Sequence, residues 1–135
     1  MSDSRDPIAR FLSSSVFGVA GASTRRDKFG NKVLRCYQQA GRRAIPVHPH
    51  EREIEGARCV ASVLELPDEA QSLSVITPPP ITERVVEAAI RRGIGHVWMQ
   101  PGAESPAAIA ACREAGINLI ADGSCVLVVL GFRDR

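Results

Sequence analysis

The chain has 135 residues, which suits one domain with one hydrophobic core. Hydrophobic residues make up 44% of the chain and its formal net charge is +2, a composition that excludes a disordered protein and argues against a nucleic-acid binder with a basic surface. No apolar run approaches the roughly 20 residues that cross a bilayer, and residues 1–7 (MSDSRDP) lack the pattern of a signal peptide.

The first third of the chain alternates short apolar segments with helical patterns. Residues 6–13 predict a short leading helix, and residues 15–20 (SVFGVA) predict a buried strand. Residues 30–40 have the apolar spacing of a helix that ends at a glycine. Residues 43–47 (RAIPV) predict a second strand, whose proline requires an early end or a position near a sheet edge.

The middle of the chain continues the alternation after a polar interruption. Residues 48–59 are rich in turn formers and predict a loop, and residues 62–66 predict a single helical turn. Residues 72–76 (SLSVI) predict a third strand, which the following prolines stop. Residues 81–92 form the clearest helical pattern, with an apolar stripe and a terminal glycine.

The last part of the chain adds two more strands and a helix. Residues 96–99 (HVWM) predict a fourth strand, and residues 106–115 predict a helix with Ser105 as its N-cap. Residues 118–121 (NLIA) predict a fifth strand. The apolar residues 125–130 fit either a further strand or a docked helix, and their pattern does not separate the two.

Strands that alternate with helices predict a single α/β domain over residues 1–135. Its core is expected to be a Rossmann-like parallel sheet of about five strands, flanked by helices and joined by right-handed crossovers. In such sheets ligands bind beyond the C-terminal ends of the strands, near the point where the strand order reverses. The loops that follow the predicted strands are therefore the expected site.

The loop after the first strand, GASTRRDKFGN, has the composition of a phosphate-binding loop. Gly21, Ala22 and Ser23 are small, so the backbone can approach a ligand closely and its N–H groups can hold a phosphate. Arg25 and Lys28 add positive charge beside them. The alternative interpretation is a tight turn with solvated charges.

The same loop does not carry the fingerprint of an NAD site. The segment GVAGAS lacks the G-x-G-x-x-G spacing, and the second strand runs into His48 and Pro49 rather than into an acidic residue. An acid at this place normally binds the ribose hydroxyls of NAD. A neutral or basic residue tolerates a phosphorylated ribose instead, which favours coenzyme A or NADP.

Five short motifs occur in a fixed order between residues 12 and 126: VAGAS, IPVHP, VITPPP, VWMQPG and DGSC. Together they resemble the CoA-binding domain family, which includes small stand-alone bacterial proteins. That family is similar to the N-terminal CoA-binding domain of the succinyl-CoA synthetase alpha subunit. The resemblance implies a nucleotide-binding domain whose cofactor is coenzyme A or an acyl-CoA.

The resemblance also implies which residues bind the cofactor. They are the phosphate-loop residues Gly21, Ala22 and Ser23, the basic residues Arg25 and Lys28, the adenosine-end residues Pro49 and Arg52, the adenine and pantetheine segment Thr77, Pro78 and Pro79, and Gln100 and Gly102 after the fourth strand. The familiar V-N-P form after the second strand is V-H-P in this chain. The ribose contact is therefore the position at which the chain departs from the family pattern.

The sequence predicts a protein that binds a ligand and does not catalyse a reaction. No Ser/His/Asp arrangement, paired-carboxylate motif or metal motif stands out, so the leading hypothesis is a non-catalytic protein that senses, stores or delivers coenzyme A. The alternative is an NADP-dependent or acyl-CoA-handling enzyme that uses His48 or Cys125. A third hypothesis is an interaction domain that has lost its ligand. Cys125 matches a family cysteine and is either a partner for a mixed disulfide with coenzyme A or a packed core residue.

The cysteines and the apolar tail predict the setting of the protein. The four cysteines are widely spaced and form no CxxC or Cys/His cluster, which predicts no metal site and a reduced, cytoplasmic setting. No membrane or nucleic-acid partner is expected. The apolar residues 125–130 make a homodimer or an unidentified protein partner plausible.

Overall fold

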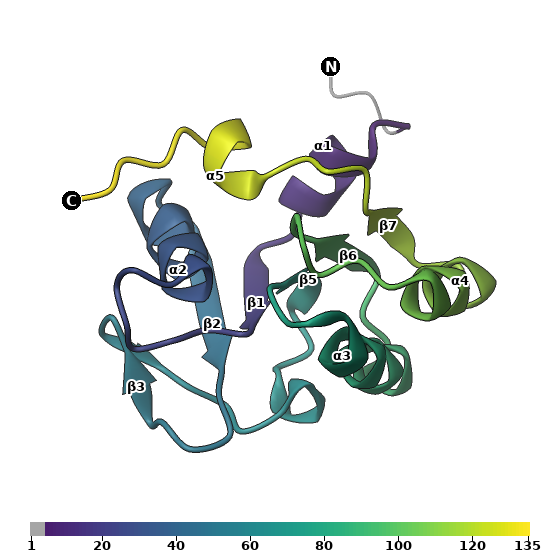
Figure 1. Ribbon diagram of the computed structural model, residues 1–135, viewed down its shortest axis with the longest axis horizontal. Helices are drawn as coiled ribbons and strands as arrows, with labels where there is room; N and C mark the ends of the chain where they lie inside the picture. Colours follow the sequence, from purple (N-terminus) through teal and green to yellow (C-terminus); the bar gives the residue numbers. More distant parts are fainter. Residues whose placement is uncertain (1–4) are drawn as a thin grey trace.

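The computed structural model describes residues 5–135 (Figure 1), so residues 1–4 of the predicted domain lie outside the described range. Its helical elements are α1 (Pro7–Leu12), α2 (Phe29–Gln39), the 3-10 turn η1 (Val63–Glu65), α3 (Pro79–Arg92), α4 (Pro106–Glu114) and α5 (Val126–Val129). Its strands are β1 (Val16–Ala20), β2 (Arg43–Val47), β3 (Glu53–Ile54), β4 (Ala57–Arg58), β5 (Ala70–Val75), β6 (His96–Met99) and β7 (Asn118–Ile120).

The main sheet has five parallel strands in the order β2-β1-β5-β6-β7. The chain passes from β1 to β2 at one edge and then returns to β5 on the other side of β1, so the strand order reverses between β1 and β5. Every residue of β1 is buried, as expected for a central strand that is covered on both faces. The predicted Rossmann-like α/β fold is confirmed.

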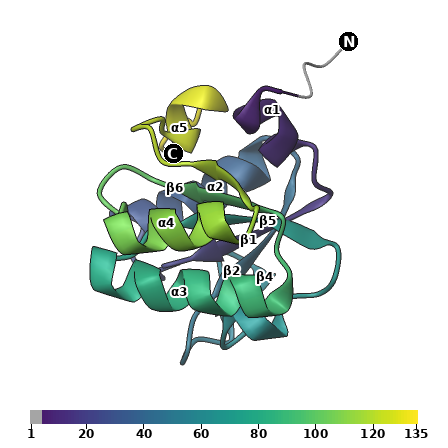
Figure 2. The ribbon, with the colours of Figure 1, turned by 90° about the vertical axis from the view of Figure 1, so that its right-hand side faces the viewer.

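Helices cover both faces of this sheet. On one face α3, α4 and η1 pack over an aliphatic core that includes Leu73 and Val86. On the other face α1, α2 and α5 pack over aromatic side chains, where Phe17 stacks on Tyr37 at 4.8 Å between ring centroids and Phe11 lies beside Phe17. Figure 2 shows α3 and α4 side by side across the sheet, with α1 and α5 at the opposite side. Only the edges and ends of the sheet are left for a ligand.

Two segments differ from their predictions or resolve an open alternative. Residues 48–59 were predicted as a loop, but they contain the short hairpin of β3 and β4, whose turn uses positive φ at Glu55 (50°) and Gly56 (77°). Strands of two residues are too short to show a period, so the pattern could not predict them. The apolar tail forms the helix α5, which packs against α2.

The proline-containing segments follow their predictions closely. β2 is an edge strand of the main sheet, which is where Pro46 is tolerated because it has no N–H to donate. α3 begins at Pro79, inside the proline run and before its predicted start at residue 81, because the first turn of a helix needs no N–H donor. Across residues 5–135, no helix has the length and apolar character that crossing a membrane requires.

Candidate ligand-binding site

The C-terminal ends of β1 and β5 meet at the point where the strand order reverses. The N–H of Ile76, just after β5, donates to the carbonyl of Ala20, the last residue of β1, at 2.8 Å. Gly21 follows β1 with φ of 98°, and a Cβ at this position would lie 2.1 Å from the carbonyl oxygen of Ile76. Only glycine fits there, so the turn after β1 lies tightly against the end of β5.

The N-terminus of α2 packs directly onto this turn. A Cβ on Gly30 would lie 1.9 Å from the carbonyl oxygen of Gly21, so a second glycine is required for the helix to approach. Lys28 is the N-cap residue and its side chain makes no capping hydrogen bond. The first N–H groups of an α-helix have no acceptor within the helix and carry partial positive charge. The turn therefore brings an anion-binding helix end beside the switch point.

The polar residues of the loop hold its shape. The Ser23 hydroxyl accepts a hydrogen bond from the N–H of Arg25 at 3.1 Å, and the Ser23 carbonyl accepts one from the Asn31 side chain at 2.8 Å. Arg25 forms an exposed ion pair with Asp27 at 3.1 Å. Within the described residues Lys28 is exposed and has no ion pair. The loop is thus preorganised, with one cation left for a ligand.

A mainly apolar cavity of about 420 Å³ opens beside this turn, between the ends of β1 and β2, η1 and α3. Its wall includes Gly21, Ala22, His48, Pro49, Thr77 and Ile81. A cavity with an apolar lining and a few polar groups suits a ligand that is largely apolar with a few polar atoms.

Two further cavities extend this one along the sheet edge. A cavity of about 460 Å³ shares His48 and Pro49 with it and adds Arg52 and Arg58. A cavity of about 250 Å³ shares Thr77 with it and reaches toward the end of β6. The three cavities form a row from the end of β2, across the switch point, to the end of β6.

The structure places most of the predicted binding residues along this row. Of the predicted binding residues, those that line at least one of the three cavities are Gly21, Ala22, Pro49, Arg52, Thr77, Pro78 and Gly102. Ser23, Arg25 and Lys28 belong to the loop between β1 and α2, and Pro79 is the first residue of α3. Sequence reasoning missed Ser62 and Arg84, which line the central cavity from η1's N-cap position and from α3.

Gln100 lies at the end of β6 but faces the interior. Its side chain is fully buried and its Oε1 accepts a hydrogen bond from the N–H of Val126 at 2.9 Å. Its Nε2 has no hydrogen-bond partner among the described residues. In this structure Gln100 joins β6 to the start of α5 and lines none of the three cavities.

The candidate reactive groups are not assembled into a catalytic cluster. Burial is the main cause that raises the pKa of the Cys36 and Cys112 thiols to about 11 each. Cys125 is half-buried at the N-cap of α5, and Cys59 is half-buried in the cavity beside His48. Over residues 5–135, no group of three or more His, Cys, Asp or Glu side chains is placed to hold a metal ion.

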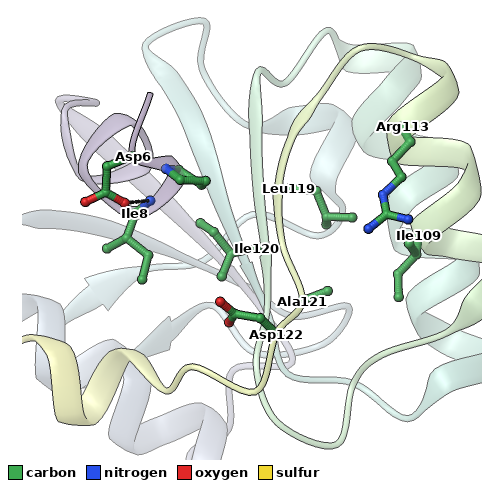
Figure 3. Close-up of a pocket in the computed structure, with 9 residues that line it drawn as sticks. Asp6, Ile8, Ile109, Arg113, Leu119, Ile120, Ala121 and Asp122 are labelled. Atoms are coloured by element: carbon green, nitrogen blue, oxygen red, sulfur yellow. Dashed lines mark hydrogen bonds between the residues drawn. The ribbon is translucent and has the colours of Figure 1, made fainter. Parts of the chain in front are cut away.

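A separate cavity of about 230 Å³ lies at the opposite edge of the sheet, between α1, α4 and β7. Figure 3 shows its lining, in which Asp6 and Asp122 extend from the chain near α1 and beyond β7. The Asp6 carboxylate caps the N–H of Ile8. Hydrogen bonds from the side chain of Ser124 and from its backbone N–H lower the pKa of Asp122. The lining thus carries two carboxylates and one guanidinium, that of Arg113, so its negative charge outweighs its positive charge and disfavours a phosphorylated ligand.

Comparison with known proteins assigns the chain to a family. The family model of the CoA binding domain matches residues 15–131. The ADP-forming acetate–CoA ligase I of Archaeoglobus fulgidus is 28% identical over 112 residues, which are 82% of this chain but only 15% of the ligase. The uncharacterized protein YneT of Bacillus subtilis is 28% identical over 109 residues, which are 81% of each protein. The structure of a conserved hypothetical protein from Pyrococcus furiosus matches with a TM-score of 0.81 at 33% identity, over 86% of this chain and 98% of that one.

Proposed function

Since the chain belongs to the CoA-binding domain family, we propose that it binds coenzyme A or an acyl-CoA in the row of cavities at the switch point. The observation that carries the proposal is the close packing of Gly21, Gly30 and the end of β5, which holds the N-terminus of α2 beside an apolar cavity. That arrangement suits a ligand with a diphosphate next to a flat ring.

We assign each part of the cofactor to a place in this row. The diphosphate lies over the turn at Gly21, with Lys28 nearby as a counter-charge. The adenine ring fills the cavity between Pro49 and Ile81. The pantetheine arm crosses Thr77 toward the end of β6, through the cavity that includes Gly102.

The proposed role is binding without catalysis, as a sensor, store or carrier of the cofactor. The chain spans only 15% of the length of the ligase that it matches, so we propose no ligase activity for it. His48 and Cys125 are the groups on which an NADP-dependent or acyl-CoA-handling enzyme would have to depend. The absence of an acid after β2 suits NADP as well as coenzyme A, which is why both belong in the test.

We also propose that the protein works in the cytoplasm and that it contacts a second copy or another protein through α5. All four cysteines are free, which suits a reducing cytoplasm. Val128 of α5 is 79% exposed, and an apolar side chain on this helix suits contact with a second copy or another protein.

Calorimetry of the purified protein with coenzyme A, acetyl-CoA, NADP and NAD tests the proposal. We expect binding of coenzyme A at micromolar strength or better, about −8 kcal/mol, with NAD much weaker. If the folded protein binds neither coenzyme A nor acetyl-CoA, the proposal is wrong. If it binds NADP alone, the enzyme alternative takes its place.

The matched variants are Lys28→Glu and Arg91→Glu. A substitution at Gly21 is unsuitable, because any Cβ would collide with the backbone of Ile76 and disturb the sheet. Lys28→Glu places negative charge beside the proposed diphosphate and should weaken binding about tenfold or more. Arg91→Glu makes the same change of charge on an exposed residue in the last turn of α3 and should leave the affinity within about threefold.

A further inference from the structure

The residue that departs from the family's V-N-P form, His48, has one ring nitrogen fully engaged by its own chain. Its Nδ1 accepts hydrogen bonds from the N–H groups of His50 and Glu51, each at 3.0 Å. A nitrogen that accepts from two N–H groups carries no proton itself. The neutral imidazole therefore has its proton on Nε2, and that N–H is a hydrogen-bond donor.

The ring of His48 lies where two cavities of the proposed site meet. It lines the apolar cavity at the switch point and also the neighbouring cavity that contains Arg52 and Arg58. Its Nδ1 faces the backbone of the following turn, and Nε2 makes no hydrogen bond with the described residues. The backbone of His48 is anchored as well, because its N–H donates to the carbonyl of Val60 at 2.9 Å.

The lining of this second cavity includes two guanidinium groups, of Arg52 and Arg58, and two carboxylates. Within the described residues neither Arg52 nor Arg58 is engaged in an ion pair. Of the two carboxylates in its lining, that of Glu65 accepts a hydrogen bond from the N–H of Ser62 at 3.1 Å, and that of Glu51 is exposed. A ribose phosphate placed beside Arg52 and Arg58 would meet two cations and the N–H of His48, and these three groups would have to offset the two carboxylates of the lining.

We infer that His48 determines specificity for a phosphorylated ribose, by donating its Nε2–H to the phosphate at the place where NAD sites carry a carboxylate. The inference rests on the proposed function and names the part of the ligand that this residue recognises. Coenzyme A has such a phosphate on its ribose and dephospho-CoA lacks it.

The same geometry explains how histidine replaces asparagine here. An asparagine side chain has a carbonyl oxygen that accepts from N–H groups two and three residues later, and an NH₂ group that donates. Histidine in this tautomer offers the same acceptor and the same donor. Aspartate keeps the acceptor, so it preserves the turn, but it replaces the donor with negative charge.

Three proteins and two ligands test the inference: wild type, His48→Asn and His48→Asp, each titrated calorimetrically with coenzyme A and with dephospho-CoA. We expect wild type to prefer coenzyme A about tenfold or more, and His48→Asn to stay within about threefold of wild type for both ligands. His48→Asp should lose about tenfold or more for coenzyme A while its affinity for dephospho-CoA stays within about threefold. NMR two-bond ¹H–¹⁵N correlations should show the Nε2–H tautomer of His48 in the wild type.

The outcomes separate this inference from the proposed function. Equal affinity of wild type for the two ligands, or equal losses for both in His48→Asp, would overturn the inference and leave the proposed function standing. An Nδ1–H tautomer would also overturn it. If wild type binds neither ligand, the proposed function fails, and the inference fails with it.

Discussion

Gly30 occupies the first turn of α2, where alanine would normally be the better helix former by about 1 kcal/mol. Here a Cβ would lie 1.9 Å from the backbone oxygen of Gly21. This oxygen belongs to the backbone, so it cannot move away as the end of a flexible side chain could. We predict that Gly30→Ala lowers the free energy of unfolding by about 2 kcal/mol or more, as overpacking does. Urea unfolding followed by circular dichroism measures this loss.

Gly95 provides the matched control for that substitution. Its φ is not in the left-handed region, and a Cβ there would meet nothing closer than the side-chain oxygen of Gln71 at 3.4 Å. Gly95→Ala should therefore change the free energy of unfolding by about 0.5 kcal/mol or less. Equal effects of the two substitutions would show that the close approach of α2 to the turn after β1 is not required.

At the scale of elements, Arg92 in the last turn of α3 joins this helix to the segment that leads into β5. Its guanidinium donates to the carbonyl of Leu66 at 3.0 Å, to that of Pro67, and to that of Ala70 at 3.2 Å. The carbonyls of Leu66 and Pro67 lie in the irregular connection after η1, and that of Ala70 lies in the first residue of β5. Arg92 therefore supplies hydrogen bonds that secondary structure does not.

We predict that Arg92→Ala lowers the free energy of unfolding by about 2 kcal/mol. The substitution removes a charged donor and leaves its buried carbonyl acceptors without a partner, and a loss of this size is typical of such hydrogen bonds. Arg91→Ala, one residue earlier and exposed, should stay within about 0.5 kcal/mol of wild type. Chemical denaturation of both variants under the same conditions makes the comparison. A loss in Arg91→Ala as large as in Arg92→Ala would indicate an effect of helix charge rather than of these contacts.

The elements that the sequence predicts are those with a repeating pattern. The five strands of the main sheet and the helices α2, α3 and α4 follow from apolar runs, helical spacing and terminal caps. The strands β3 and β4 were missed because two residues show no period, and the form of the tail at α5 was open because a short apolar run fits either structure. Caps and prolines predicted the ends of the helices and strands well. Composition was a weaker guide to whether a short segment forms a helix or a strand.

At the scale of the molecule, the position of the candidate site was predictable but its lining was only partly so. Parallel strands bring their C-terminal ends to one edge, so the loops at Gly21 and Thr77 had to lie near each other. Ser62 and Arg84 reach the same cavity because η1 packs against α3 near the end of β2, which no local pattern reveals. Gln100 occupies its predicted place after β6, but a motif does not specify the direction of a side chain.

A buried guanidinium helps to tie the last residues of the chain to α2 and to the loop after β1, beside the hydrogen bonds of Arg26 and Gln39 to the same residues. Arg35 is only 5% exposed, and it donates to the carboxylate of Asp134 at 3.0 Å, to the carbonyl of Arg26 at 2.8 Å and to the side-chain oxygen of Asn31 at 2.6 Å. Lys32 forms a second ion pair with Asp134 at 3.5 Å. The tail thus buttresses the loop that the proposed function assigns to the diphosphate.

The hydrogen bond from Arg35, helped by the charge of Lys32, lowers the pKa of Asp134 in the folded protein. A carboxyl group whose folded pKa is below its unfolded value, about 3.9, stabilises the fold above that value and loses its contribution as the pH falls through the folded pKa. We therefore predict that Asp134→Asn is less stable than wild type near pH 7 and that the difference shrinks as the pH falls below about 4.

Urea unfolding of both proteins across this pH range measures the difference, with Asp68→Asn, at an exposed aspartate, as the control that should show no such trend. A difference between wild type and Asp134→Asn that stays constant down to acidic pH would mean that the tail is held by its backbone contacts and not by this charge.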